Sequence, residues 1–534
     1  MWGREVEPAE VAGNPCRVYA FRPRSVADLL DARRWGDREY LVQGDRRLGR
    51  VVFERAVARV AADLRARGVT AGDRVLLLGF NSIEWVAAFW ALQTLGAVAA
   101  LGNAWWGDEE VRHAITEVRP VLTLTDRDLP AQTPRLTFSE LKDLVESTAE
   151  LTLEPAAVAE EDSALIMFSS GTTGAAKGVL MSHRSVVANI QNLLVPTGRL
   201  PDELPADHPG TVSMLSVPLF HLAGIQVSLN TLLSGGALVF LEGRFDPAEV
   251  PRLIQDEHVR VWGAILTMVS RVLDHPDFDS YDTSSVSSVP MGGAAVSPGL
   301  RARVSECFAG VRSRVGSLYG LTEAGGVLAA GSGPDVATRP GSVGRALPVV
   351  ELEIRRPGAD GTGEIVARTP TMTSGYLGDP ESLTDDAGWV STGDLGRIDE
   401  EGWLYVTGRS KDIIIRGGEN IAVLHVEDAL TTHPDVLEVA VVALPHADLG
   451  EEVAAAVVLR PGAGADAATL RAHAQHRLGR YEIPTSWWFH PGPLPTNATG
   501  KVLRRAVRDE WLDSGGGDRQ TAPDPSPAQP IPEC

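Results

Sequence analysis

Apolar residues along the first 150 positions alternate between a helical spacing and a strand spacing. One set recurs at intervals that place side chains on a single helix face: Phe53, Val57, Val60, Ala61 and Leu64. After Gly68 the pattern becomes an uninterrupted apolar run, Val75–Leu78, and similar runs recur at 164–168, 212–217 and 237–241. Such runs between helices are typical of parallel strands buried on both faces. We therefore expect an α/β fold whose large N-terminal domain holds several helix-covered β-sheets.

The segment from Trp85 to Trp106 carries no charged residue and is long enough to cross a bilayer. It is rich in alanine and contains polar and helix-breaking residues, among them Gln93, Thr94 and Gly96. We interpret it as a buried helix followed by a buried strand, and expect no transmembrane segment.

From about Gly341 short strands bounded by glycines replace the long helices. Helix and strand patterns then return in 423–432, 436–444 and 453–459, which predicts a small C-terminal α+β domain starting near Arg409. The last residues, 513–534, are rich in Gly, Pro, Asp and Ser, and we expect them to form a disordered tail.

Composition limits the function classes. The chain of 534 residues has 70 acidic and 49 basic side chains, so its net charge of −21 repels polyanions. We therefore expect neither nucleic-acid binding nor docking on an anionic membrane. Three widely spaced cysteines, Cys16, Cys307 and Cys534, form no disulfide framework and no metal-ligand pattern. With no apolar leader visible near the N-terminus, we expect a cytoplasmic protein.

The run 164–168 leads into Ser169-Ser-Gly-Thr-Thr-Gly-Ala-Ala-Lys177. Glycines allow backbone N–H groups to converge, hydroxyls add donors and the lysine adds charge, which together suit an anion-binding loop. The loop is not a Walker A motif, because Ala176 stands where that motif has glycine. Taken alone, the loop favours anion binding, and the alternative is a flexible turn between strands. Only four of the basic residues are lysines, Lys142, Lys177, Lys411 and Lys501.

Together with four further segments, this loop resembles the adenylate-forming superfamily, which comprises acyl-CoA synthetases, peptide-synthetase adenylation domains and luciferases. The further segments follow in the family's order: Tyr319-Gly-Leu-Thr-Glu323, Ser391-Thr-Gly-Asp394, Gly408-Arg-Ser-Lys-Asp412 and Pro495-Thr-Asn-Ala-Thr-Gly-Lys501. The resemblance is greatest to fatty acyl-CoA synthetases. It implies an N-terminal AMP- and acid-binding domain (1–408), a hinge (409–412) and a mobile C-terminal domain (413–512). It also implies ATP, Mg²⁺ and CoA as cofactors.

The resemblance implies a nucleotide site built from several segments. The phosphates would be held by Ser169, Ser170, Gly171, Thr172, Thr173, Gly174 and Lys177. Mg²⁺ would be bound by Glu323 with Thr172 or Thr173. The adenine side would be formed by Gly292, Gly293, Ala294, Tyr319, Gly320 and Thr322. Asp394, assisted by Arg409, would accept hydrogen bonds from the ribose; without the resemblance, Asp394 reads as an ordinary turn residue.

The implied catalytic set is Lys501, Thr173, Glu323 and His221. Lys501 would stabilise charge between the carboxylate and the α-phosphate, and His221 would lie beside the acyl carboxylate as a gate. Lys411 would be the hinge of the C-terminal domain. Gly417 and Gly418 would line the pantetheine tunnel.

Three positions depart from the family pattern: Ala176 replaces proline, Ile265-Leu-Thr replaces Val-Pro-Thr, and Glu482 stands where a lysine is frequent. The last departure weakens the expectation of ordinary CoA binding. Three stretches expected to form the acid pocket, 220–227, 262–269 and 318–327, are largely apolar and contain no lysine or arginine.

We therefore expect an AMP-forming acid–CoA ligase for a medium- or long-chain aliphatic acid, with an aryl acid second. The alternatives are transfer of an activated aryl acid or unusual oxyacid to a carrier protein or an amine, and a non-catalytic nucleotide-binding relative. A homodimer and a carrier protein are further candidate partners.

Overall fold

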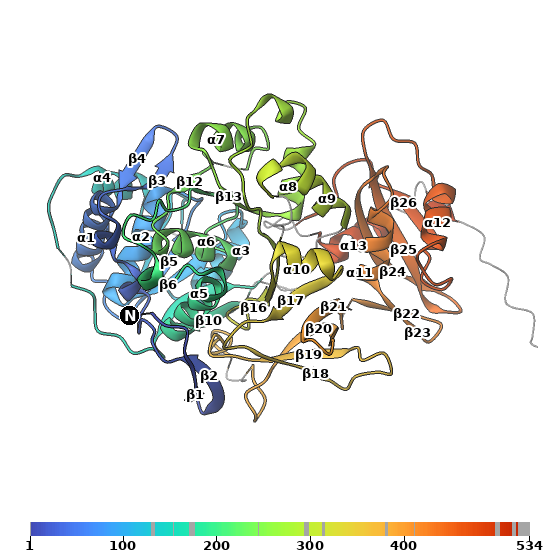
Figure 1. Ribbon diagram of the computed structural model, residues 1–534, viewed down its shortest axis with the longest axis horizontal. Coiled ribbons are helices and arrows are strands. Elements are labelled where there is room, and N and C mark those ends of the chain that lie inside the picture. The colour runs from blue at the N-terminus through green and yellow to red at the C-terminus, as the bar shows by residue number, and fades with distance from the viewer. Residues whose placement is uncertain are drawn as a thin grey trace, which may run out of the picture. The chain divides into compact units, whose positions relative to one another are not determined.

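The computed structural model describes residues 2–129, 134–152, 154–169, 177–243, 245–292, 298–311, 316–379, 383–410, 412–496, 502–514 and 519–521 (Figure 1). The chain forms two compact units. Unit 1 comprises Met1–Val296, Arg301–Thr392 and Arg397–Tyr405; unit 2 comprises Ser297–Leu300, Gly393–Gly396 and Val406–Cys534. The predicted fold class, mixed α/β with a large N-terminal domain and a small C-terminal domain, is confirmed. The hinge at 409–412 stays a prediction.

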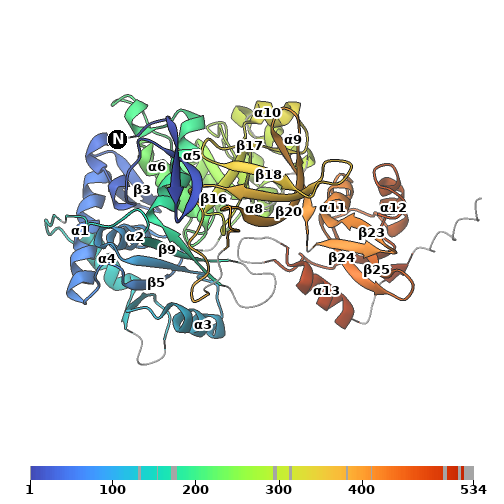
Figure 2. The same cartoon turned by 90° about the horizontal axis from the view of Figure 1, so that it is seen from below.

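Within the described part of unit 1, a six-stranded sheet has the order β10-β9-β6-β5-β7-β8. Its strands are β5 (Arg74–Leu78), β6 (Val98–Gly102), β7 (Leu122–Leu124), β8 (Arg135–Leu136), β9 (Ser163–Phe168) and β10 (Gly178–Ser182). All neighbours are parallel except β10, which is antiparallel to β9. Figure 2 shows helices above and below this sheet. Leu76 and Leu78 pack in one cluster with Val111 and Ala114 of the helix α3 (Asp108–Val118).

A larger sheet follows the order β18-β19-β20-β21-β17-β16-β15-β14-β13-β11-β12-β3-β4 through the described residues. The strands from the N-terminal half are β3 (Glu39–Gln43), β4 (Arg46–Gly49), β11 (Ser213–Leu215), β12 (Leu238–Phe240), β13 (Val261–Ile265) and β14 (Met291–Gly292). The later ones are β15 (Ser317–Leu321), β16 (Gly326–Gly331), β17 (Ser342–Ala346), β18 (Glu351–Arg355), β19 (Gly363–Arg368), β20 (Val390–Ile398) and β21 (Trp403–Arg409). A separate hairpin pairs β1 (Val6–Val11) with β2 (Asn14–Tyr19). The chain passes between the two units inside β20 and β21.

The uncharged segment 85–106 is a buried helix and a buried strand, as predicted. Helix α2 (Ile83–Leu95) is buried along its whole length, begins at the cap Ser82 and ends at Gly96 in a left-handed conformation, and β6 follows. The other helices of unit 1 are α1 (Arg50–Ala66), α4 (Phe138–Glu146), α5 (His183–Thr197), α6 (Leu222–Leu233), α7 (Glu249–Glu257), α8 (Leu266–Leu273), α9 (Pro298–Cys307, whose first residues belong to unit 2) and α10 (Gly333–Thr338). Across the described ranges, no helix combines the length and hydropathy that crossing a membrane requires.

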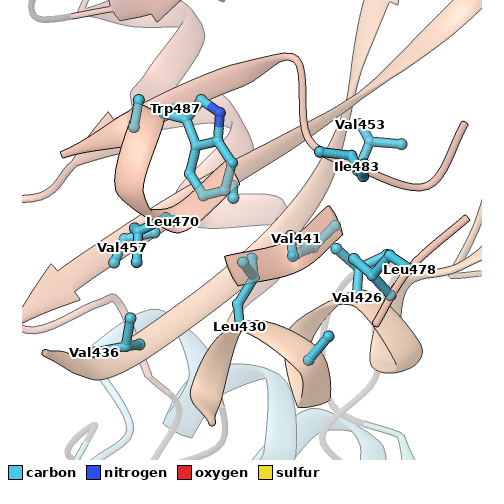
Figure 3. Packing of buried hydrophobic residues seen from close by; sticks show 14 of the residues in the cluster. Val426, Leu430, Val436, Val441, Val453, Val457, Leu470, Leu478, Ile483 and Trp487 are labelled. Carbon is cyan, nitrogen blue, oxygen red and sulfur yellow. The ribbon is translucent and has the colours of Figure 1, made fainter. Parts of the chain in front are cut away.

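Unit 2 is built on a second six-stranded sheet within its described residues, in the order β23-β22-β25-β26-β27, with β24 pairing β25. The strands are β22 (Ile413–Arg416), β23 (Glu419–Ala422), β24 (Val436–His446), β25 (Gly450–Leu459), β26 (Ser486–Phe489) and β27 (Arg519–Thr521). Alternate residues of β24 and β25 enter two different cores. The core in Figure 3 gathers Val441, Val453 and Val457 with residues of α11 (Val423–Thr431) and α12 (Ala467–Gln475). The opposite core includes Trp511 of α13 (Arg504–Asp513).

The prediction of a disordered tail is wrong for Arg519–Thr521. These residues form β27, antiparallel to β26, with Arg519 opposite Trp488 and Thr521 opposite Ser486. An edge strand has unpaired N–H and C=O groups that a short polar segment can satisfy without burying side chains of its own. Composition cannot reveal such a strand. Residues 515–518 and 522–534 lie outside the described residues.

Candidate active site

Four neighbouring parallel strands of unit 1 bring the predicted acid and adenine segments together. β11, β13, β14 and β15 are adjacent and parallel, so their carboxyl ends lie at one edge of the sheet. His221 follows β11, Ile265 ends β13, Gly292 ends β14, and Tyr319 lies on β15. In open α/β sheets ligands bind outside the carboxyl ends of strands. Gly293 and Ala294 lie outside the described residues.

His221 is the N-cap of helix α6, and its environment keeps the imidazole neutral. Its carbonyl accepts the N–H of Ile225 at 3.1 Å, and its own N–H donates to Pro218 at 3.1 Å. The ring atom Nε2 is shielded from solvent and has no hydrogen-bond partner among the described residues. Burial lowers the pKa of His221 to about 4, so the ring carries no charge at neutral pH. A neutral ring suits a gate beside a carboxylate better than a cationic one that would bind it.

Aromatic rings extend from His221 toward the surface. The ring centroid of Phe220 lies 4.8 Å from that of His221 and 5.5 Å from that of Trp105, which lies 5.3 Å from that of Phe80. Phe220 is buried, whereas Trp105 and Phe80 are partly exposed. This row places apolar, polarisable surface directly beside the predicted carboxylate position.

The segment from Tyr319 to Glu323 is held by a bulge and a tight turn. The pairing of β15 with β16 shifts register between Tyr319 and Gly320. A Cβ on Gly320 would lie 2.2 Å from the carbonyl oxygen of Gly326, so only glycine fits. The N–H of Gly325 donates to the carbonyl of Thr322 at 2.9 Å and closes the turn. The predicted adenine-side residues Tyr319, Gly320 and Thr322 and the carboxylate Glu323 therefore share one segment fixed by these contacts.

Ser169 and Lys177 close the predicted phosphate loop. β9 and β10 form an antiparallel hairpin, and the N–H of Ser169 donates to the carbonyl of Lys177 at 3.0 Å across its open end. The loop therefore connects two strands and is not followed directly by a helix, unlike a Walker A loop. The intervening predicted residues lie outside the described residues: Ser170, Gly171, Thr172, Thr173 and Gly174.

Lys177 and Glu323 both contact Tyr376, a residue that the sequence reasoning missed. The Tyr376 hydroxyl donates to Glu323 Oε1 at 3.3 Å, and Lys177 Nζ lies 5.0 Å from the ring centroid. Burial, with help from the nearby Glu323 carboxylate, raises the pKa of Tyr376 to about 12, so the hydroxyl is a donor at neutral pH. A lone tyrosine in a loop has no periodicity or motif that would have marked it.

The described residues fit Mg²⁺ held together with phosphate. Among them, no group of three or more His, Cys, Asp or Glu side chains could hold a metal ion by itself. Mg²⁺ is commonly bound by one or two carboxylates with phosphate oxygens and water. The half-buried Glu323 carboxylate, which like Lys177 contacts Tyr376, suits that arrangement.

In unit 2, Asp394 is a buried member of a strand. It lies inside β20, its side chain is 7% exposed, and Oδ1 accepts a hydrogen bond from Arg409 Nε at 2.9 Å. Ser410 fastens the same region, since its N–H and its hydroxyl both donate to the Gly393 carbonyl, at 2.9 and 3.1 Å. The interpretation of Asp394 as an ordinary turn residue is therefore wrong. Arg409, which the resemblance gave as assisting Asp394 at the ribose, is its ion-pair partner, and the ribose contact itself stays a prediction.

Gly417 and Gly418 form the turn between β22 and β23, with φ of +58° and +91°. Glycine accepts such positive φ angles at both central positions of a hairpin turn without strain. The two predicted lysines, Lys411 and Lys501, lie outside the described residues.

An ion-pair network joins the residues that follow the two lysines along the chain. Arg504 donates through Nε and Nη2 to both oxygens of Glu427, at 2.9 and 2.6 Å, and through Nη1 to Asp412 at 3.0 Å. Bidentate arginine–carboxylate pairs fix geometry as well as charge. Asp412, next to Lys411, is thus tied to α13, which begins three residues after Lys501.

Glu482, the charge reversal noted in the sequence, has a local structural role. Its Oε2 accepts the N–H of Gly479 at 2.7 Å, and the ring nitrogen of His425 lies 3.9 Å away. The carboxylate closes the turn before β26, a task that a lysine could not perform because it has no acceptor.

Comparison with known proteins gives matches over most of the chain. Residues 30–377 match the family model described as AMP-binding enzyme, and residues 425–501 match the AMP-binding enzyme C-terminal domain. A feruloyl-CoA synthase from an Amycolatopsis species is 34% identical over 472 residues, covering 85% of this chain and 92% of that protein. A long-chain-fatty-acid–CoA ligase from Bacillus subtilis is 29% identical over 514 residues, covering 85% of this chain and 89% of that protein.

Solved structures are similar over nearly the same length. ATP-bound MatB from Rhodopseudomonas palustris has a TM-score of 0.79 and 26% identity, covering 91% of this chain and 99% of that one.

Proposed function

The chain belongs to the AMP-binding enzyme family, and on that premise we propose that it is an AMP-forming acid–CoA ligase. In the first half-reaction a carboxylate oxygen attacks the α-phosphorus of ATP, the bond to the β-phosphate oxygen breaks, and pyrophosphate leaves. In the second, the thiol of CoA loses its proton and attacks the acyl carbon, and AMP leaves. The observation that carries the proposal is the convergence of His221, Gly292, Tyr319 and Glu323 at adjacent strand ends.

Each residue of the proposed site has its own role in the first half-reaction. Lys177 binds the β- and γ-phosphates, and Glu323 would hold Mg²⁺. Bound Mg²⁺ neutralises negative charge on the triphosphate and on the departing pyrophosphate. Tyr319 flanks the adenine and Asp394 accepts the ribose hydroxyls. Lys501 stabilises charge on the reacting carboxylate and α-phosphate, where a compact ammonium is better suited than a broad guanidinium.

The second half-reaction uses the C-terminal domain. We assign Lys411 as the hinge residue, because a junction residue absorbs the dihedral change when a domain rotates. The glycine turn at Gly417 and Gly418 presents backbone without side chains, which suits a narrow pantetheine passage. As a gate beside the acyl carboxylate, the neutral His221 would not trap the acid as an ion pair.

The acid is an apolar monocarboxylate, for which we propose a medium- or long-chain aliphatic acid. The pocket stretches 220–227, 262–269 and 318–327 hold no lysine or arginine for a second carboxylate. This argues against a dicarboxylic acid. An aryl acid is the second candidate, supported by the aromatic row at Phe220 and Trp105 and by the feruloyl-CoA synthase relative.

CoA is the proposed acceptor. Glu482 had weakened that expectation, but its hydrogen bond to the Gly479 N–H accounts for the charge reversal by local structure. The named relatives at 34% and 29% identity are both CoA ligases, which supports acid–CoA ligation.

The test is acid-dependent pyrophosphate release over a panel of acids, with and without CoA. The panel contains octanoate, palmitate, ferulate and 2-succinylbenzoate, and thioester is quantified by mass. We expect AMP, pyrophosphate and an octanoyl or palmitoyl thioester, with 2-succinylbenzoate inactive. Pyrophosphate without any thioester would overturn CoA as acceptor and direct the search to a carrier protein or an amine. ADP as the product would overturn the chemistry itself.

A further inference from the structure

Tyr376 stands between the two charged groups to which the proposed function gives the triphosphate and its metal. Its hydroxyl donates to Glu323 Oε1 at 3.3 Å, while Lys177 Nζ lies 5.0 Å from its ring centroid. Glu323 and Lys177 are 146 residues apart in the sequence; Lys177 immediately precedes β10 of one sheet of unit 1, and Glu323 follows β15 of the other. One side chain therefore contacts both.

The backbone around Tyr376 is fastened to the strand that leaves the phosphate loop. Leu377 N–H donates to Gly178 O at 2.7 Å, Leu180 N–H donates to Gly375 O at 3.0 Å, and Ser374 N–H donates to Leu180 O at 2.8 Å. Tyr376 and Val179 form an antiparallel bridge. The position of the Tyr376 ring relative to the backbone of Lys177 is thus set by a short ladder of backbone hydrogen bonds between the Tyr376 segment and β10.

The same segment is fastened to the Glu323 turn on its other side. Thr373 Oγ1 donates to the carbonyl of Glu323 at 2.8 Å, and Thr371 Oγ1 donates to the carbonyl of Ala324 at 2.7 Å. A Cβ on Gly325 would lie 1.6 Å from the carbonyl oxygen of Thr371, so the two backbones approach too closely there for any residue but glycine. Thr371 to Leu377 therefore joins β10 to the turn that carries Glu323.

An aromatic ring is well suited to hold a lysine that must bind phosphate. The ring face attracts the ammonium without occupying its three N–H donors. Lys177 side chain is 61% exposed, and its distance of 4.0 Å to Asp379 Oδ2 is too long for a hydrogen bond. The donors of Lys177 thus stay available to an incoming triphosphate.

We propose that Tyr376 is a positioning residue that holds the Glu323 carboxylate and the Lys177 ammonium in register for the metal-bound triphosphate. The hydroxyl restrains one oxygen of Glu323, and the ring restrains Lys177. This inference rests on the proposed function, because it takes Glu323 as the metal ligand and Lys177 as the phosphate ligand.

Two substitutions separate the two contacts. Tyr376→Phe keeps the ring and removes the bond to Glu323, whereas Tyr376→Leu removes both. Tyr405→Phe is the matched control, because the Tyr405 hydroxyl also donates to a carboxylate, Asp399 Oδ2 at 3.2 Å, and its ring also lies under a cation, Arg397 at 4.1 Å. Tyr405 is in unit 1 and has no role in the proposed site.

The readout is ATP binding by calorimetry in the absence of acid and CoA, with Mg²⁺ titrated and with EDTA. For Tyr376→Phe we expect the half-saturating Mg²⁺ concentration to rise about 3- to 10-fold, as for one ordinary hydrogen bond, with ATP affinity in EDTA unchanged. For Tyr376→Leu we expect an additional loss of about 2- to 5-fold that persists in EDTA, from the cation–ring contact. Tyr405→Phe should match the wild type in both conditions.

A double substitution completes the test. In a Glu323→Gln background, Tyr376→Phe should add less than about 2-fold to the Mg²⁺ requirement, because the two act as one unit. A wild-type Mg²⁺ requirement in Tyr376→Phe, or an equal loss with and without Mg²⁺, overturns the inference. A wild-type protein that does not bind ATP at all would instead overturn the proposed function.

Discussion

Replacement of Asp394 by asparagine tests the proposed ribose contact. Asp394 is 7% exposed and Oδ1 receives a hydrogen bond from Arg409 Nε at 2.9 Å. Asparagine keeps the size of the side chain and removes its charge. Hydrogen bonds to a charged group contribute about 1.5–3 kcal/mol, so we expect ATP affinity to fall about 10- to 150-fold.

Folding should be affected much less than binding. The Arg409 side chain is 41% exposed and water can replace its lost partner, so loss of this ion pair should cost at most about 1 kcal/mol of unfolding free energy. Urea unfolding of the variant checks this directly. Asp399→Asn is the control, since Asp399 accepts hydrogen bonds from Trp403 N–H at 2.8 Å and from the Tyr405 hydroxyl at 3.2 Å.

The decisive assay measures four affinities by calorimetry in the absence of the acid substrate: those of the wild type and of Asp394→Asn, each for ATP and for 2′,3′-dideoxy-ATP. The wild type should bind 2′,3′-dideoxy-ATP about 10- to 150-fold more weakly than ATP, because the dideoxy ribose has no hydroxyl to donate. Asp394→Asn should bind both nucleotides with nearly the same, weak affinity. If removing the ribose hydroxyls weakened binding to Asp394→Asn by the same factor as binding to the wild type, a ribose contact at Asp394 would be refuted. An equally large loss of ATP affinity in Asp399→Asn would refute it as well.

Three further changes address the proposed catalytic lysine, the proposed hinge and a buried acid. Lys501→Ala should lower acid-dependent pyrophosphate exchange about 10²- to 10³-fold with an unchanged circular dichroism spectrum, and near-normal exchange would contradict the assignment. Lys411→Pro should spare adenylate formation and block thioester formation, measured separately; equal loss of both would argue against a hinge. Burial, then the neighbouring Glu427, raises the pKa of Asp428 to about 6, so the contribution of Asp428 to the unfolding free energy of the wild type falls as pH rises from about 4 to 6. Asp428→Asn should therefore raise the unfolding free energy by about 1–2 kcal/mol at pH 7.5 and by almost nothing near pH 4, in urea titrations.

Periodic and motif signals predicted the elements of this protein well. The spacing from Phe53 to Leu64 became α1, the apolar run Val75–Leu78 became most of β5, and the uncharged segment 85–106 became α2 and β6. These signals succeed because the local order of apolar residues determines which face of a helix, or whether a whole strand, is buried.

Features that depend on distant partners could not be predicted in this way. Thr-Gly-Asp is ordinary turn chemistry, yet Asp394 is buried in β20 because Arg409 and Ser410 of a neighbouring strand region fasten it. Tyr376 gains its contacts from Lys177 and Glu323, which no local pattern connects to it. Such positions need the tertiary pairing of segments before their chemistry becomes visible.

The contact at Tyr376 suits a lysine at the end of the proposed phosphate loop. Cation–aromatic contacts among the described residues otherwise use arginine, as in Arg34, Arg50, Arg339, Arg345, Arg355, Arg368 and Arg397. The planar guanidinium group of arginine stacks on an aromatic ring, so its N–H donors point parallel to the plane of that ring. Lysine touches the ring with a compact charge and can rotate its donors toward phosphate oxygens. In a sequence where only four of 49 basic residues are lysines, Lys177 over Tyr376 is therefore the expected choice for a cation that is positioned by a ring and bound by a triphosphate.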